Sequence, residues 1–191
     1  MRKLIVSTLV SLDGVVQDPG GFGETDQGGW ANPYFTEEAV QDSYENLMNS
    51  DYFLCGRISY ELMSKAWGKI KEGAYLERMN AIPKLVASRT LKEPLEWNAT
   101  LIKGDVAQEI ARLKQEQGKN IEMYGSTDLM QTLMQHDLID QYRIWVHPLI
   151  LGHGKRLFPE SGYPATLELK DTKIRTSGVV GLIFEPRRAT S

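Results

Sequence analysis

Residues 121–158 read IEMYGSTDLMQTLMQHDLIDQYRIWVHPLILGHGKRLF, and this stretch decides the fold. Its apolar pattern predicts a strand at Ile121–Tyr124, a helix at Thr127–Gln135 and a second strand at Gln141–His147. A buried strand that enters a helix through Gly125-Ser126 leaves backbone N–H groups unpaired at the helix start. That position favours an anion, because the helix dipole and the free amides act together. The pattern therefore predicts a phosphate-bearing ligand here.

The bulk composition is that of a globular protein with a single domain spanning residues 1–191, with 41% apolar and 25% charged residues. A net charge of -3 gives no basic footprint for nucleic acid. The one cysteine, Cys55, excludes an internal disulfide framework and fits a reducing compartment. No apolar run is long enough to span a membrane, and the early apolar run is interrupted by Ser7, Thr8 and Ser11. We therefore expect a buried first strand and a cytoplasmic protein.

Strands and helices alternate along the rest of the chain. Gly14–Gly29 is too rich in glycine for a regular element and predicts a long, mobile loop. We expect further strands at Leu4–Leu9, Tyr52–Leu54, Lys84–Ala87, Leu167–Lys170 and Val179–Glu185, and further helices at Pro33–Met48, Ile58–Trp67 and Asp105–Gln117. This order predicts an α/β fold with a mostly parallel sheet. The last two strands have no helix between them, so they predict an antiparallel C-terminal edge.

Four expected strand ends carry residues suited to ligand binding: Ser11–Gly14, Gly56-Arg57, Ser88-Arg89 and Gly125-Ser126. A parallel sheet brings such ends to one edge. Two helix starts and two arginines match a ligand with separate phosphates, as in NADPH, whose 2′-phosphate is usually bound by Arg. The GxGxxG fingerprint is absent, which argues against an ordinary Rossmann site. The alternatives stay open: Ser126 as a simple helix cap, and each arginine as a solvated surface residue.

Five motifs in order carry a family resemblance: SLDG (11–14), GRISYE (56–61), VASRTL (86–91), YGSTDL (124–129) and LIDQYRIWVHPLILGHGKRLF (138–158). Together they resemble the dihydrofolate-reductase-like superfamily, and within it the reductase domain at the C-terminus of the riboflavin-biosynthesis deaminase-reductase, the RibD C-terminal family. The resemblance implies a three-layer fold with helices on both faces of the sheet, NADPH as hydride donor and often a homodimer. The chain has no zinc-deaminase signature, so it does not resemble the whole bifunctional enzyme.

The resemblance also implies roles for individual residues. The helix that faces the cofactor phosphates would begin at Gly56 and Arg57, with Ser59 adding a hydroxyl. The 2′-phosphate would be held by Ser88 and Arg89. The pyrophosphate would be cradled by the turn and first residues of the next helix, namely Gly125, Ser126, Thr127, Asp128 and Leu129. The Gly14–Gly29 loop would be a lid over the nicotinamide.

The substrate end is less marked in the sequence. Asp13 is the first candidate for proton supply, since it ends a strand before a flexible glycine; a turn residue is the alternative. An aromatic pocket for a planar substrate could be lined by Trp30, Phe35 and Tyr44, with core or lid packing as the alternative. The three histidines show no metal spacing, so no metal is expected.

Two functions follow as hypotheses. The leading one is an NADPH-dependent reductase that transfers a hydride to a small planar heterocycle of the pteridine or aminopyrimidine type, similar to 5-amino-6-(5-phosphoribosylamino)uracil reductase. The alternative is a non-catalytic module that binds a dinucleotide or a pterin and retains the fold. In either case the partner is a small molecule, with a homodimer expected.

Overall fold

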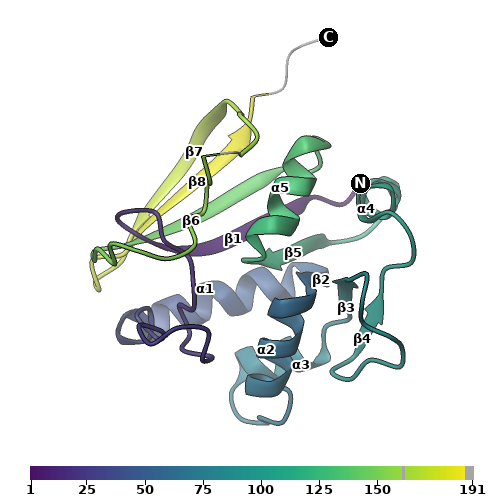
Figure 1. Ribbon diagram of the computed structural model, residues 1–191, viewed down its shortest axis with the longest axis horizontal. Helices are drawn as coiled ribbons and strands as arrows, with labels where there is room; N and C mark the ends of the chain where they lie inside the picture. Colours follow the sequence, from purple (N-terminus) through teal and green to yellow (C-terminus); the bar gives the residue numbers. More distant parts are fainter. Residues whose placement is uncertain (161, 188–191) are drawn as a thin grey trace.

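A computed structural model describes residues 1–160 and 162–187 of the chain. Its centre is an eight-stranded sheet in the order β4-β3-β2-β5-β1-β6-β8-β7 (Figure 1). The first six of these pair in parallel, whereas β6-β8 and β8-β7 are antiparallel. The strands are β1 (Leu4–Ser11), β2 (Ser50–Gly56), β3 (Lys84–Ala87), β4 (Ala99–Leu101), β5 (Asn120–Tyr124), β6 (Gln141–His147), β7 (Leu167–Ile174) and β8 (Val180–Pro186). The expected parallel sheet with an antiparallel edge is confirmed.

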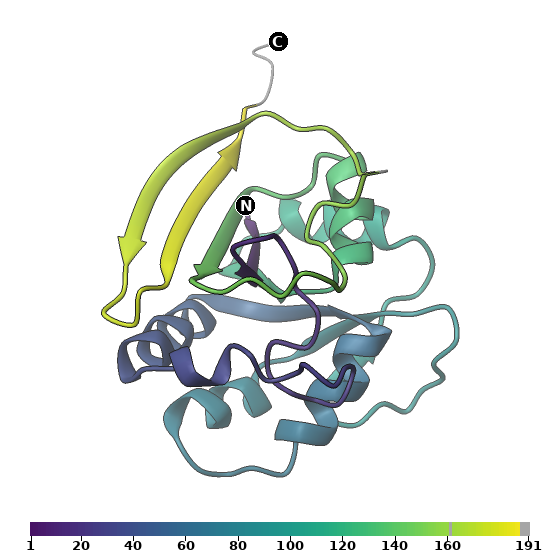
Figure 2. The same cartoon turned by 60° about the vertical axis from the view of Figure 1, so that its left-hand side comes forward.

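Helices cover both faces of this sheet, as Figures 1 and 2 show. One face carries α1 (Glu37–Met48), α2 (Arg57–Trp67) and α3 (Ala74–Ala81), preceded by a short 3-10 turn, η1 (Asn32–Tyr34). The other face carries α4 (Val106–Gln115) and α5 (Thr127–Gln135). The three-layer arrangement is thus confirmed.

The alternation of side chains along the strands separates two cores. In β2, Phe53 and Cys55 pack with α1, α2 and α3, while Leu54 points to the opposite face. There it joins Ile110 of α4 and Leu133 of α5, both fully buried. Each such side chain contributes about 1.5–3 kcal/mol on burial, so the two cores fix which helix lies on which face.

Most helix boundaries in the structure agree, to within a few residues, with those predicted from the sequence. Thr36 caps α1, since its hydroxyl accepts a hydrogen bond from the Ala39 amide at 3.3 Å. Asp105 caps α4 in the same way. Ile58 of α2 is 50% exposed and lines a cavity, so it does not join the core. The sequence patterns also missed α3 and β4, which are only 8 and 3 residues long.

The glycine-rich loop after β1 folds around the buried carboxylate of Asp18. Its oxygens accept hydrogen bonds from four successive amides, those of residues 22–25. Gly28 is required here, since a Cβ at that position would overlap the Asp18 carboxylate. Figure 2 shows this loop, in dark purple, crossing the front of the molecule beside α2. There Phe22 meets the edge of Trp67 with ring centroids 5.5 Å apart. The loop is therefore held from within and at α2.

None of the helices in the described part of the chain combines the length and the apolar character that a membrane crossing needs.

Candidate functional site

A cavity of about 920 Å³ lies at the carboxyl ends of β1, β2, β3 and β5. This volume is at the upper end of the usual range for ligand pockets. Each of the ten residues predicted to contact a cofactor lines it: Gly56, Arg57, Ser59, Ser88, Arg89, Gly125, Ser126, Thr127, Asp128 and Leu129. They come from three loops, and the parallel sheet brings them together as expected.

The two helix starts in the cavity are joined by Ser126. Its hydroxyl accepts a hydrogen bond from the Gly56 amide at 3.0 Å and lies 2.6 Å from the Ser59 hydroxyl. Ser126 does occupy the N-cap position of α5, but its side chain makes no bond to its own helix, because its backbone is left-handed (φ 57°, ψ 61°). The start of α2 also lacks a side-chain cap. The first amides of both helices are therefore left for a ligand.

Gly125 forms the open part of this cradle. Its φ is +59°, which glycine adopts without strain, and no atom lies within 4 Å of where a Cβ would be. Gly125 and Ser126 are thus two successive residues of left-handed backbone at a helix start. The Gly125 amide donates to the Ser7 carbonyl at 3.3 Å, so the amides of Ser126 and Thr127 are the ones that this turn leaves for an anion.

The second anion-binding element follows β3. The Ser88 hydroxyl accepts hydrogen bonds from the amides of Thr90 and Leu91, at 3.1 and 3.0 Å, so it orders the turn. Arg89 is exposed and makes no hydrogen bond or ion pair with the residues that the structure describes. Arg57 by contrast pairs with Glu61 at 2.8 Å on the surface of α2. Arg89 is therefore the arginine available for a ligand.

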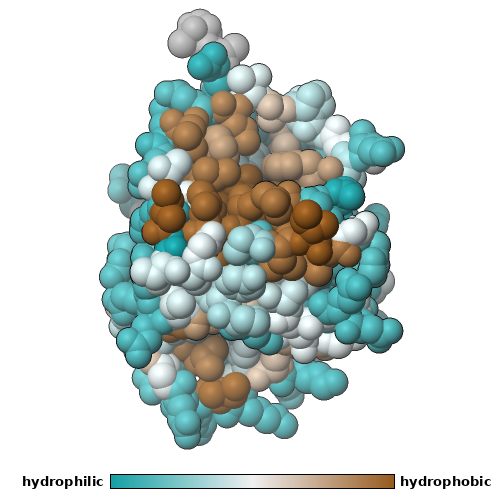
Figure 3. All heavy atoms as spheres, turned by 90° about the vertical axis from the view of Figure 1, so that its left-hand side faces the viewer, coloured by the Kyte–Doolittle hydropathy of each residue, from teal (hydrophilic) through white to brown (hydrophobic). Residues whose placement is uncertain are grey.

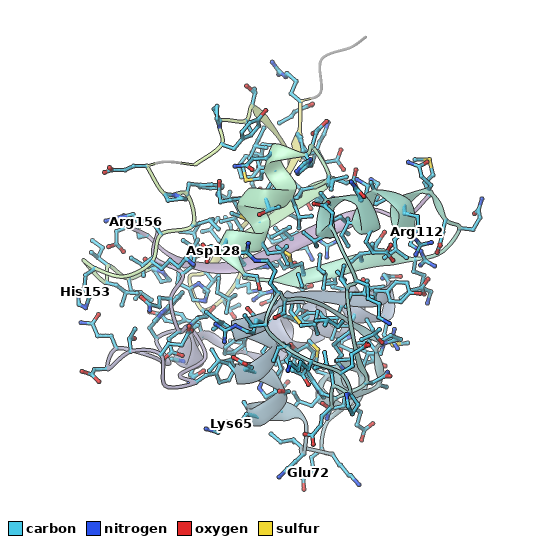
Figure 4. All side chains as sticks on the ribbon, turned by 45° about the vertical axis from the view of Figure 1, so that its right-hand side comes forward. Lys65, Glu72, Arg112, Asp128, His153 and Arg156 are labelled. Carbon is cyan, nitrogen blue, oxygen red and sulfur yellow. The ribbon has the colours of Figure 1, made fainter. Side chains whose placement is uncertain are left out.

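Asp128 and Lys155 form an ion pair at the start of α5, with 2.7 Å between Oδ1 and Nζ. Figure 4 shows Asp128 at the N-terminal end of that helix, while His153 and Arg156 lie farther out on the loop. Lys155 lines the cavity and offsets the negative charge that Asp128 brings to a predicted phosphate site. Sequence reasoning missed Lys155, because the Gly-rich exit after β6 carries no local sign of this contact.

The structure does not support Asp13 as the proton donor. Its side chain accepts hydrogen bonds from the Ser11 hydroxyl and from the amides of Leu151 and Gly152, at 2.6, 3.1 and 2.8 Å. These bonds, that from Ser11 first, lower the pKa of Asp13 to about 2. The carboxyl group is therefore ionised at neutral pH, and Asp13 does not line the cavity. It is the turn residue of the alternative interpretation, tying β1 to the loop after β6.

Of the three aromatic residues predicted at the substrate, only Phe35 lines the cavity. Trp30 donates its indole N–H to the Gln17 carbonyl at 2.8 Å and meets the edge of the buried His147 ring. It therefore fastens the glycine-rich loop. Tyr44 is half-buried on α1 and does not line the cavity. For Trp30 and Tyr44 the packing alternative fits the geometry.

A different aromatic residue, Trp145 of β6, occupies the cavity wall. The guanidinium of Arg175 stacks on it at 3.6 Å from the ring centroid and donates to Asp42 of α1 at 3.0 Å. Lys173 pairs with Asp42 at the same distance. Burial by itself would raise the pKa of Asp42. The hydrogen bonds from Lys173 and Arg175 outweigh this effect, so the net shift of the pKa is downward. Sequence reasoning missed this cluster, because the two cations lie in the β7–β8 hairpin, far along the chain from Asp42.

A buried carboxyl group, Glu122 of β5, lies behind the same wall. Its Oε1 is 2.5 Å from the hydroxyl of Ser7 in β1, and Ser7 lines the cavity. Burial raises the pKa of Glu122 to about 7. The sequence indicated only a buried strand at this position.

The site thus combines two uncapped helix starts, a free guanidinium and a hollow lined by glycine, all at the carboxyl edge of a parallel sheet, which is an arrangement suited to an extended anion. The sequence pattern of the RibD C-terminal domain matches residues 2–182, and the chain belongs to that family.

The relatives of known sequence or structure cover nearly the whole chain. YyaP of Bacillus subtilis (strain 168), an uncharacterised protein, is 29% identical over 96% of this chain and 94% of its own length. The crystal structure of a putative riboflavin biosynthesis protein from Shewanella sp. PV-4 superposes with a TM-score of 0.74 at 21% identity, over 97% of this chain and 99% of that one.

A larger relative is similar over one part only. The deaminase/5-amino-6-(5-phosphoribosylamino)uracil reductase of Thermotoga maritima matches with a TM-score of 0.65 at 12% identity, over 97% of this chain but 57% of that one. At such identities the structural matches establish the fold. The chain therefore has the dihydrofolate-reductase-like fold that its motifs resemble.

Proposed function

We propose that this protein is an NADPH-dependent reductase that acts on a C=N or C=O bond of a small planar heterocycle, of the pteridine or aminopyrimidine type. The observation that carries the proposal is the convergence of ten predicted cofactor contacts on one cavity. Membership of the RibD C-terminal family supports the same activity.

The residues present fit a dinucleotide with an extra phosphate. The hollow at Gly125, with no atom within 4 Å of a Cβ position, and the uncapped starts of α2 and α5 would hold the pyrophosphate. Arg89, free of other partners in the described residues, would hold the 2′-phosphate. When bound, NADPH supplies the hydride. The chain itself contributes positioning and, through the loop folded around Asp18, exclusion of water.

Replacement of Arg89 by Ala tests this proposal. We expect the affinity for NADPH to fall about 10- to 100-fold, because a hydrogen-bonded charge pair contributes about 1.5–3 kcal/mol. The affinity for NADH, which lacks the 2′-phosphate, should change little. Titration of both nucleotides by calorimetry measures the two affinities.

Arg112→Ala is the matched control, since that arginine pairs with Glu109 and Glu116 on the surface of α4, outside the cavity. Equal affinities of the Arg89 and Arg112 variants for NADPH would refute the cofactor assignment. A protein that binds NADPH tightly but oxidises it with no pteridine or aminopyrimidine would instead be the non-catalytic binding module.

We also propose that the protein is a homodimer, joined through the antiparallel end of the sheet. Two large apolar residues of β7 lie open to solvent: Ile174 is 79% exposed and Leu169 is 50% exposed. Figure 3, which views the molecule from the hairpin side, shows apolar side chains gathered into a broad patch. Patches of this kind on a soluble protein mark contact surfaces. Ile144 and Trp145 of the neighbouring β6 are buried in the protomer and so are not part of this patch.

Ile174→Asp tests the dimer, because a charge at the centre of an apolar contact is costly to bury. We expect light scattering to show a dimer for the wild type and a monomer for this variant. Ile70→Asp is the control. Ile70 is an apolar residue that is 39% exposed and lies on the opposite side of the sheet, near α2. This substitution should leave the mass of the particle unchanged. A wild-type monomer would contradict the proposal.

A further inference from the structure

We propose that Glu122 and Ser7 deliver the proton that accompanies hydride transfer, with Ser7 touching the substrate and Glu122 acting through it. This inference rests on the proposed reductase function. The two residues lie on neighbouring strands, β5 and β1, and point to the same face of the sheet. Neither was singled out by the sequence patterns.

The carboxyl group of Glu122 has one hydrogen-bond partner among the described residues, the Ser7 hydroxyl, which donates to Oε1 in the structure. Its side chain is buried, and Oε1 lies 2.5 Å from the Ser7 hydroxyl oxygen. Oε2 has no hydrogen-bond partner among the described residues, since Nη1 of Arg143 is 3.7 Å away. An ionised carboxylate would leave several lone pairs unpaired in a site buried from solvent, which is costly. A neutral carboxyl group can reverse this bond and donate its one O–H to the Ser7 oxygen at the same separation of 2.5 Å. The pKa of Glu122, raised by burial to about 7, is consistent with a neutral group.

Ser7 connects this acid to the cavity. It lines the cavity wall with Thr8 and Leu9 and is itself 8% exposed. If the Ser7 oxygen accepts the proton of Glu122, its own hydrogen is left to donate toward a ligand. In the strand order, Ser7 is three strands from the turn that carries Arg89. At roughly 4.8 Å per strand, this separation of about 14 Å sets Ser7 well away from Arg89, whereas the Gly125 amide donates to the Ser7 carbonyl at 3.3 Å.

The charged and titratable groups that face Glu122 explain why it can lose its proton during turnover. Arg143 approaches from β6, Tyr75 from α3, and Tyr124 from the same strand. Arg143 is the one cation among them. A carboxylate formed at Glu122 would be stabilised by that guanidinium at 3.7 Å, in a site of low dielectric.

The proposed step balances as follows. The substrate C=N or C=O double bond becomes a single bond when its carbon receives the hydride, and the cofactor is oxidised. The substrate heteroatom takes the hydroxyl proton of Ser7, and Ser7 takes the proton of Glu122. Glu122 remains as a carboxylate beside Arg143. Once the product has left, Ser7 passes its proton to Glu122 and takes one from water in the cavity.

The test combines a titration with kinetics. Infrared difference spectra of wild type against Glu122→Gln, recorded without substrate, should show a protonated carboxyl group at pH 6 that is lost as the pH rises past 7. Turnover of 5-amino-6-(5-phosphoribosylamino)uracil with NADPH should fall about 100-fold in kcat for Glu122→Gln and Ser7→Ala. The dissociation constant of NADPH should stay within about twofold for both variants. Ser7→Thr, which keeps the hydroxyl, should restore turnover, and Glu168→Gln at an exposed carboxylate should have no effect.

Three results would overturn the inference: an ionised Glu122 at pH 6, wild-type turnover by the Glu122→Gln or Ser7→Ala variant, or no recovery with Ser7→Thr. Failure of the proposed function is distinguishable, because it would appear as a wild type that reduces no pteridine or aminopyrimidine. The infrared titration then still decides the state of Glu122: an ionised group refutes the acid, and a protonated group supports it.

Discussion

The two ends of the cavity are built from different parts of the protein. The phosphate end uses the open turn at Gly125 and the uncapped starts of α2 and α5, together with the exposed side chain of Arg89. The other end uses buried side chains, namely Ser7 with Glu122 behind it and Trp145 with Arg175 stacked on it. The first can bind charge without burying a charged group. The second places ionisable groups where their side chains are almost entirely buried.

This difference has an energetic consequence. Exposed charges such as those of Arg57 and Glu61 contribute little to stability, typically about 0–1 kcal/mol. A buried polar atom without a partner, such as Oε2 of Glu122, costs about 1–3 kcal/mol. A fold keeps such a group where function requires it. The comparison thus identifies the Glu122 end as the part of the site that stability alone does not explain.

The largest expected effect concerns the pH dependence of stability. The folded pKa of Glu122 is raised from 4.5 to about 7, so its stabilising contribution is complete below pH 4.5 and is lost as the pH rises to 7. The corresponding difference is about 3 kcal/mol, at 1.36 kcal/mol per pKa unit. Urea unfolding of the wild type and of Glu122→Gln at pH 4.5 to 8 measures it. As the pH rises across this range, the free energy of unfolding of the wild type should decrease relative to that of the variant.

Carboxyl groups with lowered pKa values, such as Asp42 and Asp51, act in the opposite direction, but they are present in both proteins and cancel in the difference. Glu168→Gln is again the control, since the exposed Glu168 has its pKa lowered by Lys170. A constant difference between wild type and Glu122→Gln over the whole range would show that Glu122 is ionised when folded. The two ends of the cavity would then not differ in the way described.

The fold and the residues of the phosphate end could be predicted from the sequence, because their signals are local. A strand followed directly by Gly125-Ser126 or by Gly56-Arg57 shows both the turn and the helix start within a few residues. Parallel pairing then brings these ends together, whatever the lengths of the connections. The Thr36 cap of α1 is equally local, since its hydroxyl bonds an amide three residues farther along the chain.

The acid end could not be predicted in this way, because it depends on strand register. Ser7 and Glu122 are 115 positions apart, and a shift of one residue between β1 and β5 would turn one of them to the other face. Asp13 was misjudged because a turn aspartate and a catalytic one have the same local pattern. Only its bonds to Leu151 and Gly152 separate the two interpretations.

A smaller effect, expected at the phosphate end, separates binding from stability. Gly125→Ala adds a methyl group to the open hollow and strains a backbone with φ of +59°. Gly152→Ala imposes a similar strain, at φ of +80° and with no atom within 4 Å, but outside the cavity. Both variants should lose about 1 kcal/mol of stability, the usual cost of a left-handed alanine.

Only Gly125→Ala should weaken NADPH binding, by about tenfold or 1.4 kcal/mol, because its methyl group takes the space proposed for the pyrophosphate. Thermal unfolding and NADPH titration of the two variants separate the shared strain from the local contact. Equal affinities would mean that the amides at the start of α5 do not contact the cofactor. The phosphate end would then be reduced to Arg89 and the start of α2, with Ser126 serving only to join the two helices.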